Sequence, residues 1–329
     1  MSEETTSETI SETIPQTTPE QVEAGTISEL AVDLPRRSGF VALIGAPNAG
    51  KSTLINQLVG TKVSIVTHKV QTTRTQIRGI VMAASAQIVF IDTPGIFEPK
   101  RRLDRAMVTS AWAGAGDADV VAFLIDAERG IKGDAIEILQ KLQNTHYKKI
   151  LILNKIDRVP NEKLLALAAS ATDITKFDKV FMISALKGFG CADIIKWLSE
   201  TLPEGPWYYP EDQLSDIPMR MTSAEVTREK LMLRLHQELP YASHVETEKW
   251  VETDKEVRVD QVIYVERDAH KKIVIGAKGQ TLRSIGEASR KELTEMMGKP
   301  VHVFLFVKVR ENWVNDPERY REMGLEFTS

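Results

Sequence analysis

Cysteine is almost missing from this chain of 329 residues, which contains only Cys191. A single thiol cannot form an intrachain disulfide, and it excludes a metal centre built from several cysteines of one chain. Cys191 begins a predicted helix without an evident base beside it, so we expect it to be structural rather than nucleophilic. This cysteine usage is typical of reducing compartments, and we expect a cytoplasmic protein.

Long apolar runs and an excess of basic charge are missing as well. No run approaches the ~18 apolar residues of a membrane-spanning helix, and the N-terminus lacks the basic start and apolar core of a secretory signal. The chain has 42 Lys and Arg against 46 Asp and Glu, a net charge of −4. This balance excludes a surface that is basic throughout, so nucleic-acid binding would need a local patch.

The first 35 residues contain no Lys or Arg, whereas eight residues of this stretch are acidic. Ser, Thr and Glu dominate, with a near-repeat at residues 7–14. Such a composition cannot bury enough apolar surface to offset the entropy of ordering. We predict a disordered acidic extension over residues 1–36, and a specific docking arm is the alternative.

From Phe40 onwards, short apolar runs alternate with amphipathic stretches. Strands are predicted at residues 40–44, 87–91, 120–125, 149–153 and 179–183, with helices at 52–59, 103–113 and 135–143 between them. This alternation predicts an α/β domain with a doubly wound, mostly parallel sheet over residues 37–203. The proline-rich stretch after it cannot continue a helix, and we assign residues 204–222 to a linker.

Residues 223–316 show another order of elements. A helix at 224–238 precedes strands at 245–251 and 257–265, helical pieces within 273–297 and a strand at 301–309. This order predicts a small α+β domain. Residues 317–329 are expected to form a C-terminal tail.

The segment Gly45–Ser52 fits the pattern G-x-x-x-x-G-K-[ST] directly after a predicted strand and at the start of a predicted helix. The glycines allow the backbone to form a cup of N–H groups for phosphates, and the helix N-terminus adds its dipole. Lys51 would supply a cation to the β- and γ-phosphates, and Ser52 a hydroxyl to Mg²⁺. We therefore predict a P-loop.

Guanine rather than adenine is favoured by Asn154-Lys155-Ile156-Asp157, which follows a predicted strand. The Asp157 carboxylate can accept hydrogen bonds from the guanine ring N–H and the exocyclic amine. Adenine offers neither donor on that edge and would leave a desolvated carboxylate unpaired. Ser184-Ala185-Leu186, after another strand, can brace the guanine carbonyl through a backbone N–H.

A metal-binding corner is predicted from Asp92-Thr93-Pro94-Gly95, because an acid at a strand end can hold Mg²⁺ and Gly95 can donate to the γ-phosphate. Thr72 and Thr73 can offer a further hydroxyl, and we expect Mg²⁺ to be held by Ser52, Asp92 and Thr73. The expected contacts to GTP come from Gly45, Ala46, Pro47, Asn48, Ala49, Gly50, Lys51, Ser52, Thr53, Asp92, Thr93, Pro94, Gly95, Ile96, Asn154, Lys155, Asp157, Ser184, Ala185 and Leu186.

These segments resemble, in order, the five guanine-nucleotide motifs of translation-factor-class GTPases. The resemblance implies hydrolysis of GTP to GDP and phosphate with Mg²⁺, and loops that reorder during the cycle. Ile96 stands where many small GTPases carry a glutamine that orients water, so we expect slow intrinsic hydrolysis. Relatives with Asn at the position of Asn48 suggest K⁺ as an activator, which is a hypothesis.

An RNA-binding loop is predicted from Gly276-Ala277-Lys278-Gly279, which fits the G-x-x-G turn of a KH module between two helices. From Lys271 to Arg310 there are nine basic residues and three acidic ones, which indicates a polyanion partner. A solvated surface face is the alternative. The predicted RNA-binding residues are Lys271, Lys272, Ile273, Ile275, Gly276, Ala277, Lys278, Gly279, Arg283 and Arg290.

With both motif sets in one chain, residues 39–316 resemble the Era-type family of bacterial ribosome-assembly GTPases, in which switch I matches Gln71, Thr72, Thr73 and Arg74. The resemblance implies a type II KH domain that binds the 3′ end region of 16S ribosomal RNA, and a role in maturation of the small (30S) subunit or its precursor. It also implies a cytoplasmic protein with peripheral association at the inner face of the cell membrane. We expect a monomer.

Three other functions compete with this one. A GTPase could regulate another RNA-processing or cell-cycle step at the membrane. An enzyme of metabolism or tRNA modification would need a second catalytic site, and none is evident after Pro210. A purely structural RNA-binding module would not need the complete set of Lys51, Ser52, Asp92 and Asp157.

Overall fold

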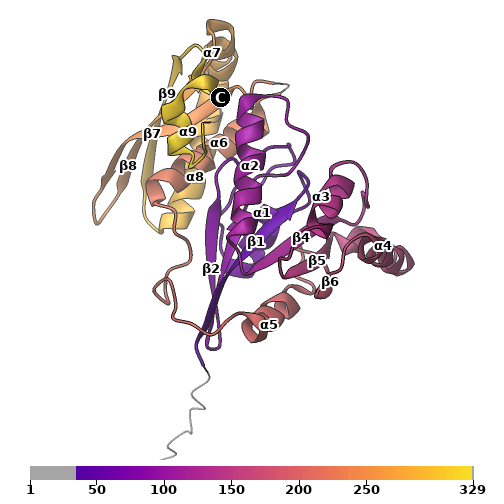
Figure 1. The fold of residues 1–329 in the computed structure, drawn as a ribbon. Helices are drawn as coiled ribbons and strands as arrows, with labels where there is room; N and C mark the ends of the chain where they lie inside the picture. The colour runs from indigo at the N-terminus through magenta and orange to yellow at the C-terminus, as the bar shows by residue number, and fades with distance from the viewer. Residues whose placement is uncertain (1–34, 237, 328–329) are drawn as a thin grey trace, which may run out of the picture. The chain divides into compact units, whose positions relative to one another are not determined.

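The computed structural model describes residues 35–236 and 238–327 (Figure 1). The predicted acidic extension lies almost entirely outside the described residues. The first part of the fold contains β1 (Arg37–Gly45), α1 (Lys51–Val59), β2 (Ile77–Ala83), β3 (Ala86–Asp92), α2 (Arg102–Gly116), β4 (Val120–Asp126), α3 (Asp134–Gln143), β5 (Lys149–Asn154), η1 (Ile156–Arg158), α4 (Asn161–Ile174), β6 (Lys179–Ile183) and α5 (Cys191–Thr201).

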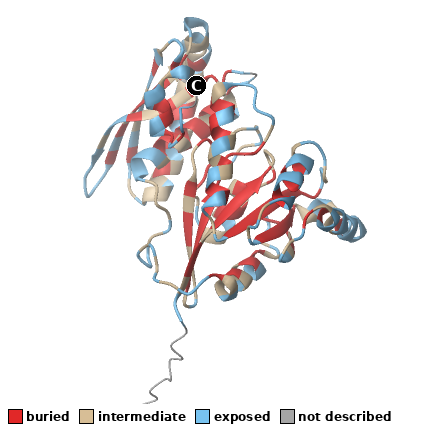
Figure 2. Ribbon diagram, viewed as in Figure 1, coloured by how far each residue is buried: buried red, intermediate tan, exposed pale blue. Residues whose placement is uncertain are grey.

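Six of these strands form one sheet in the order β2-β3-β1-β4-β5-β6, and all neighbours are parallel except β2 and β3. Strands β3, β4 and β5 are buried along their whole length, as Figure 2 shows. Helices α1 and α5 pack on one face of the sheet, and α2, α3 and α4 pack on the other. Continuous apolar runs are what a parallel sheet covered on both faces requires. The predicted doubly wound α/β fold is confirmed.

Strand β2 and helix α4 were not predicted from the sequence. β2 contains Gly79 as its third residue, which weakens its strand pattern. The glycine is needed because a Cβ atom at this position would lie 2.8 Å from Val59 and 2.9 Å from Ile55 of α1. The close approach of α1 thus explains why this strand lacks a typical strand sequence.

The second part of the fold contains α6 (Met219–Arg234), β7 (Ser243–Glu252), β8 (Val257–Val265), α7 (Asp268–Ile275), η2 (Ala277–Gly279), α8 (Gln280–Met297), β9 (Val301–Val309), η3 (Trp313–Asn315) and α9 (Pro317–Glu322). The three strands form a sheet in the order β7-β8-β9, with β7 antiparallel and β9 parallel to β8. Residues of α6, α7 and α8 share two apolar clusters with one face of the sheet. The predicted α+β domain is confirmed.

The boundaries differ in detail from the predicted ones. Helix α6 begins at Met219, after Pro218, within the stretch assigned to the linker. The residues assigned to the tail include α9, and Tyr320 is fully buried against Leu103 and Met107 of α2. The linker aromatics pack on the sheet, since the Tyr208 ring lies 4.8 Å from that of Phe40. The C-terminal segment is therefore a folded part of the molecule.

Candidate nucleotide site and RNA-binding face

The P-loop connects β1 to α1, and its glycines have backbone conformations that other residues disfavour. Gly50 has φ +99°, and a Cβ atom there would lie 2.2 Å from the Asn154 side chain. Gly95 lies in the loop after β3 and faces the P-loop, where a Cβ atom on it would lie 2.9 Å from Pro47. Both glycines are required because two further loops approach the P-loop this closely.

Lys51, the first residue of α1, is 6% exposed and folds back over the loop. Its ammonium donates to the carbonyl oxygens of Gly45, at 3.0 Å, and Ala46, at 3.3 Å. Burial lowers the pKa of Lys51 to about 8, although Asp92 opposes this effect. A partly desolvated cation whose hydrogen-bond acceptors, among the described residues, are neutral carbonyls is suited to an incoming phosphate.

Asp92, at the end of β3, is fully buried and collects hydroxyl groups from three segments. Its Oδ2 atom accepts hydrogen bonds from Ser52 at 2.7 Å, Ser64 at 2.7 Å and Thr73 at 3.3 Å. Burial raises the pKa of Asp92, against the opposing effect of Lys51. The Oδ1 atom is buried and has no hydrogen-bond partner among the described residues. An orphaned carboxylate oxygen beside two hydroxyls fits a divalent cation that prefers oxygen ligands.

Thr72 and Thr73, in the loop that precedes β2, have different hydrogen-bond partners. The Oγ1 atom of Thr73 lies 3.0 Å from the Ser52 hydroxyl, in the corner formed by Asp92. The hydroxyl of Thr72 instead hydrogen-bonds to Thr67 at 2.7 Å and to the Lys69 carbonyl at 2.8 Å. Only Thr73 is therefore placed for a metal ion.

Asn154 and Lys155, after β5, connect the base-recognition segment to the P-loop. The Asn154 amide donates to the Ala49 carbonyl at 2.9 Å, and its oxygen accepts from the backbone N–H of Ala185 at 3.0 Å. Lys155 donates to the Asn48 carbonyl at 2.9 Å and to Asp126 at 2.6 Å. Asp126 was not predicted, although its place at the carboxyl end of the buried strand β4 could have indicated it.

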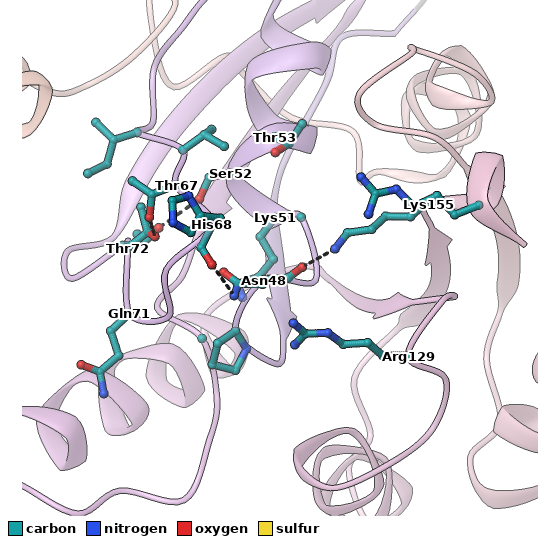
Figure 3. A pocket seen from close by; sticks show the side chains of 17 residues that line it. Asn48, Lys51, Ser52, Thr53, Thr67, His68, Gln71, Thr72, Arg129 and Lys155 are labelled. Atoms are coloured by element: carbon teal, nitrogen blue, oxygen red, sulfur yellow. Dashed lines mark hydrogen bonds between the residues drawn. The ribbon is translucent and has the colours of Figure 1, made fainter. Parts of the chain in front are cut away.

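A cavity of about 300 Å³ lies over the P-loop (Figure 3). Arg129 and His68 extend towards it, and neither was predicted. Predicted residues that line it are Pro47, Asn48, Gly50, Lys51, Ser52, Thr53, Gln71, Thr72, Thr73, Gly95 and Lys155.

Other predicted residues lie behind or beside this cavity. Thr93 is fully buried and donates to the Leu43 carbonyl at 2.7 Å. The side chain of Ile96 packs in an apolar cluster while its N–H donates to the Gly45 carbonyl at 3.0 Å. Asp157 lies 3.7 Å from Lys187 at the next loop. Residues that do not line the cavity are Gly45, Ala46, Ala49, Asp92, Thr93, Pro94, Ile96, Asn154, Asp157, Ser184, Ala185, Leu186 and Arg74.

The predicted RNA-binding loop joins α7 to α8 through η2. Gly276 and Gly279 have φ +74° and +76°, and Lys278 has φ +50° and an exposed side chain. Ile273 is 57% exposed, whereas Ile275 packs partly against the domain core. Of the two isoleucines that were expected to line a groove, Ile273 is the exposed one.

The basic residues of this domain divide into two groups. Lys299, Lys308 and Arg310 form ion pairs with Glu252, Glu248 and Asp316. No ion pair is recorded, within the part of the chain that the structure describes, for the exposed cations of α7, η2 and α8, which are Lys272, Lys278, Arg283, Arg290 and Lys291. The G-x-x-G loop and the two helices that flank it therefore present positive charge that no ion pair of the described residues offsets.

The comparisons with known proteins agree with the two predicted domains. A family model described as 50S ribosome-binding GTPase matches residues 40–155, and a KH domain model matches residues 238–314. The chain is 68% identical over 295 residues to GTPase Era of Rhizobium meliloti (strain 1021), covering 89% of this chain and 94% of that protein. The chain belongs to the Era family of GTPases.

Two further similarities support this assignment. GTPase Era of Brucella suis biovar 1 (strain 1330) is 65% identical, with 88% of this chain and 94% of that protein covered. A solved structure of Era with MgGDPNP and nucleotides 1506–1542 of 16S ribosomal RNA superposes with a TM-score of 0.83 at 38% identity. That match covers 88% of this chain and 99% of the solved chain. The predicted GTPase and KH domains are thus confirmed.

Two remaining expectations concern the single cysteine and membrane-spanning helices. Burial raises the pKa of the Cys191 thiol to about 11, which agrees with a structural rather than a nucleophilic cysteine. Within residues 35–236 and 238–327, no helix is long and apolar enough to cross a membrane.

Proposed function

We propose that this GTPase is a switch that binds the 3′ end region of 16S ribosomal RNA and acts in maturation of the small ribosomal subunit. The main support is the cluster formed by Ser52, Thr73 and Asp92 next to Lys51. The same chain also presents a basic G-x-x-G loop whose charges have no ion pair among the described residues. GTP and GDP are the ligands of the first site. The RNA is the ligand of the second.

The residues at the first site divide the work of holding GTP. Lys51 and the P-loop N–H groups would bind the phosphates, and Asp92, Ser52 and Thr73 would hold Mg²⁺. When bound, Mg²⁺ neutralises charge on the β- and γ-phosphate oxygens. Because the side chain of Ile96 is buried in the core, it does not position the attacking water, which supports slow intrinsic hydrolysis.

Asp157 is proposed to recognise the base, with Ser184, Ala185 and Leu186 bracing the guanine carbonyl. Its carboxylate is 15% exposed and lies 3.7 Å from Lys187, next to the loop that carries Ser184, Ala185 and Leu186. Replacement of Asp157 by Asn should shift preference from GTP towards xanthosine triphosphate, because the amide can donate to the xanthine carbonyl. Competition binding measures the shift, and unchanged GTP selectivity would contradict the assignment.

The solved relative holds nucleotides 1506–1542 of 16S ribosomal RNA, and the same region is proposed as the partner of this chain. The Gly279→Asp variant tests the loop, since a Cβ atom at this position meets nothing within 4 Å and the added carboxylate would repel phosphates. Gly298→Asp is the matched control, because Gly298 also has a positive φ, +65°, and equally open surroundings. RNA affinity should fall only for Gly279→Asp, with GTP affinity retained in both variants.

K⁺ is proposed as an activator that Asn48 would help to hold. The Asn48 side-chain amide donates to the backbone carbonyl of His68 at 3.1 Å, which holds Asn48 next to an oxygen ligand from a second loop. A monovalent cation at this point would add positive charge next to the phosphates. We further propose, from family membership, a monomeric cytoplasmic protein with peripheral association at the inner face of the membrane.

A further inference from the structure

Two phenylalanines of β9 point away from the core of the KH domain. Side chains alternate along this strand: Val303, Leu305 and Val307 pack towards the helices, and the residues between them face outwards. Phe304 is 43% exposed and Phe306 is 52% exposed. Exposed aromatic side chains two positions apart on one strand make a surface that the fold itself does not need.

Phe304 and Phe306 lie on one face of β9, and α8, which begins at the G-x-x-G loop, packs on its other face. A Cβ atom on Gly286, in the second turn of α8, would lie 3.5 Å from the side chain of Leu305. β9 pairs only with β8 within the described residues, so its other edge lies at the border of the sheet. An RNA strand bound beside the N-terminal part of α8 would therefore reach Phe304 and Phe306 by crossing the free edge of β9.

The charges around the pair are balanced, unlike those around the loop. Arg258 pairs with Asp260 at 2.9 Å, and Lys308 pairs with Glu248 at 2.7 Å. The Arg258 guanidinium also lies 4.6 Å from the centroid of the Phe304 ring. A neutral aromatic surface beside a basic one is suited to the faces of bases, whereas the phosphates are held at the loop.

The size of the open surface argues for bases rather than for a protein. The C-terminal segment covers the other end of this sheet face, where Arg319 lies 5.1 Å from the centroid of the Tyr264 ring and pairs with Glu246. A stable protein interface buries about 800 Å² on each partner, whereas a whole phenylalanine buries only about 150–250 Å². Two half-exposed rings supply far less than a protein partner requires.

We propose that Phe304 and Phe306 form a stacking platform for bases of single-stranded RNA that extends beyond the G-x-x-G loop. This proposal rests on the proposed RNA-binding function. Successive outward side chains of a strand are about 6.5–7 Å apart, which allows each ring to stack on a different base. The platform would lengthen the RNA site from about four nucleotides at the loop to a longer segment.

The test uses the full-length protein with a non-hydrolysable GTP analogue and an RNA that comprises nucleotides 1506–1542 of 16S ribosomal RNA. The variants are Phe304→Ala, Phe306→Ala and the double variant, with Phe304→Tyr and Phe306→Tyr as conservative replacements. Phe189→Ala is the control, because Phe189 is also a phenylalanine, 63% exposed, and lies in the GTPase domain. Affinity is measured by fluorescence anisotropy over a series of salt concentrations.

Each Ala variant should weaken RNA binding about fivefold or more, and the double variant should weaken it further. The Tyr variants should retain affinity, since tyrosine also stacks. Because stacking involves no phosphate contact, the salt dependence should stay as in the parent protein, whereas Lys278→Ala should reduce it. Unchanged affinity in the double variant, while Gly279→Asp loses binding, would overturn the platform and leave the loop assignment intact.

Two other results would also decide the question. If Gly279→Asp and the double Phe variant both bind the RNA as the parent does, the proposed RNA function fails together with the platform. If the double variant binds naked RNA normally but binds small-subunit particles more weakly, the aromatic pair contacts a protein, and the platform is refuted.

Discussion

Arg74, the last residue of the predicted switch I, donates a hydrogen bond to the backbone carbonyl of Ser243 in the KH domain, 2.9 Å away. The same guanidinium donates to the carbonyls of Tyr241 at 3.1 Å and Pro240 at 3.4 Å. Burial, with the neighbouring charge of Arg228, lowers the pKa of Arg74 to about 9. Since Thr73 is the adjacent residue, the loop that contributes Thr73 to the metal corner, the cluster of Ser52, Thr73 and Asp92, is hydrogen-bonded directly to the RNA-binding domain.

Replacement of Arg74 by Ala should lower the free energy of unfolding by about 3 kcal/mol, because three buried carbonyls lose a charged donor. It should also reduce the effect of a GTP analogue on RNA affinity, since switch I is no longer held to the KH domain. Urea denaturation and RNA binding with GDP or the analogue measure the two effects. Arg101→Ala is the control, because Arg101 is 54% exposed in an exposed ion pair and should cost less than ~0.5 kcal/mol. Equal stability of the two variants would contradict this role of Arg74.

Thr73 and Thr72 provide a matched pair for testing the metal corner. Thr73→Ala should weaken binding of a GTP analogue with Mg²⁺ about tenfold, a loss of about 1.4 kcal/mol, because a hydroxyl beside Ser52 and Asp92 is removed. Thr72→Ala should have a much smaller effect, since its hydroxyl hydrogen-bonds within its own loop. GDP affinity should change little in either variant. Titration calorimetry checks this, and a larger loss for Thr72→Ala would reverse the assignment.

The site residues that could be predicted from the sequence are those that belong to short, continuous sequence motifs. Lys51, Ser52 and Asp92 belong to short segments in which a strand end, a glycine turn and a helix start follow one another, and the structure brings them together. The strands of the parallel sheet could be predicted because each is a short, continuous apolar run in the sequence. β2 was not predicted, and its Gly79, which the close packing of α1 requires, interrupts its apolar pattern.

Contacts between distant segments could not be predicted. Asp126 ends a buried strand, but nothing in the sequence pairs it with Lys155, and Ser64, which bonds to Asp92, belongs to no recognisable pattern. The outward orientation of Phe304 and Phe306 also depended on knowing which face of β9 the helices cover. Sequence alternation shows that a strand has two faces, but the partner helices decide which of them is solvent-exposed.

K⁺ should accelerate GTP hydrolysis relative to Na⁺ at equal ionic strength, and Asn48→Ala should remove the difference. The reason is that the Asn48 amide and the His68 carbonyl meet beside the P-loop, where a cation of the right size would offset charge on the phosphates. Phosphate release is measured in KCl, NaCl and choline chloride. Equal rates in all three salts would refute the proposal, and a K⁺ effect that survives in Asn48→Ala would place the cation elsewhere.

His244 should make the protein less stable in mild acid. Its ring stacks on Trp313 at 5.6 Å, and burial, with the charges of Arg74, Arg319 and Arg228, lowers its pKa to about 3 from 6.5. The folded state therefore requires a neutral ring, so this contribution to stability is complete above pH 6.5 and is lost progressively as the pH falls from 6.5 towards 3.

Between pH 7.5 and pH 5, this group alone should lower the free energy of unfolding by about 2 kcal/mol. The variant His244→Gln, which cannot take up a proton, should show a correspondingly smaller decrease over the same interval, although it starts from a lower stability. His302→Gln is the control, because the side chain of His302 is 51% exposed and faces Glu256. Urea denaturation at each pH gives the free energies. If His244→Gln and the parent lose the same stability between the two pH values, the ring is already accessible to protons in the folded state.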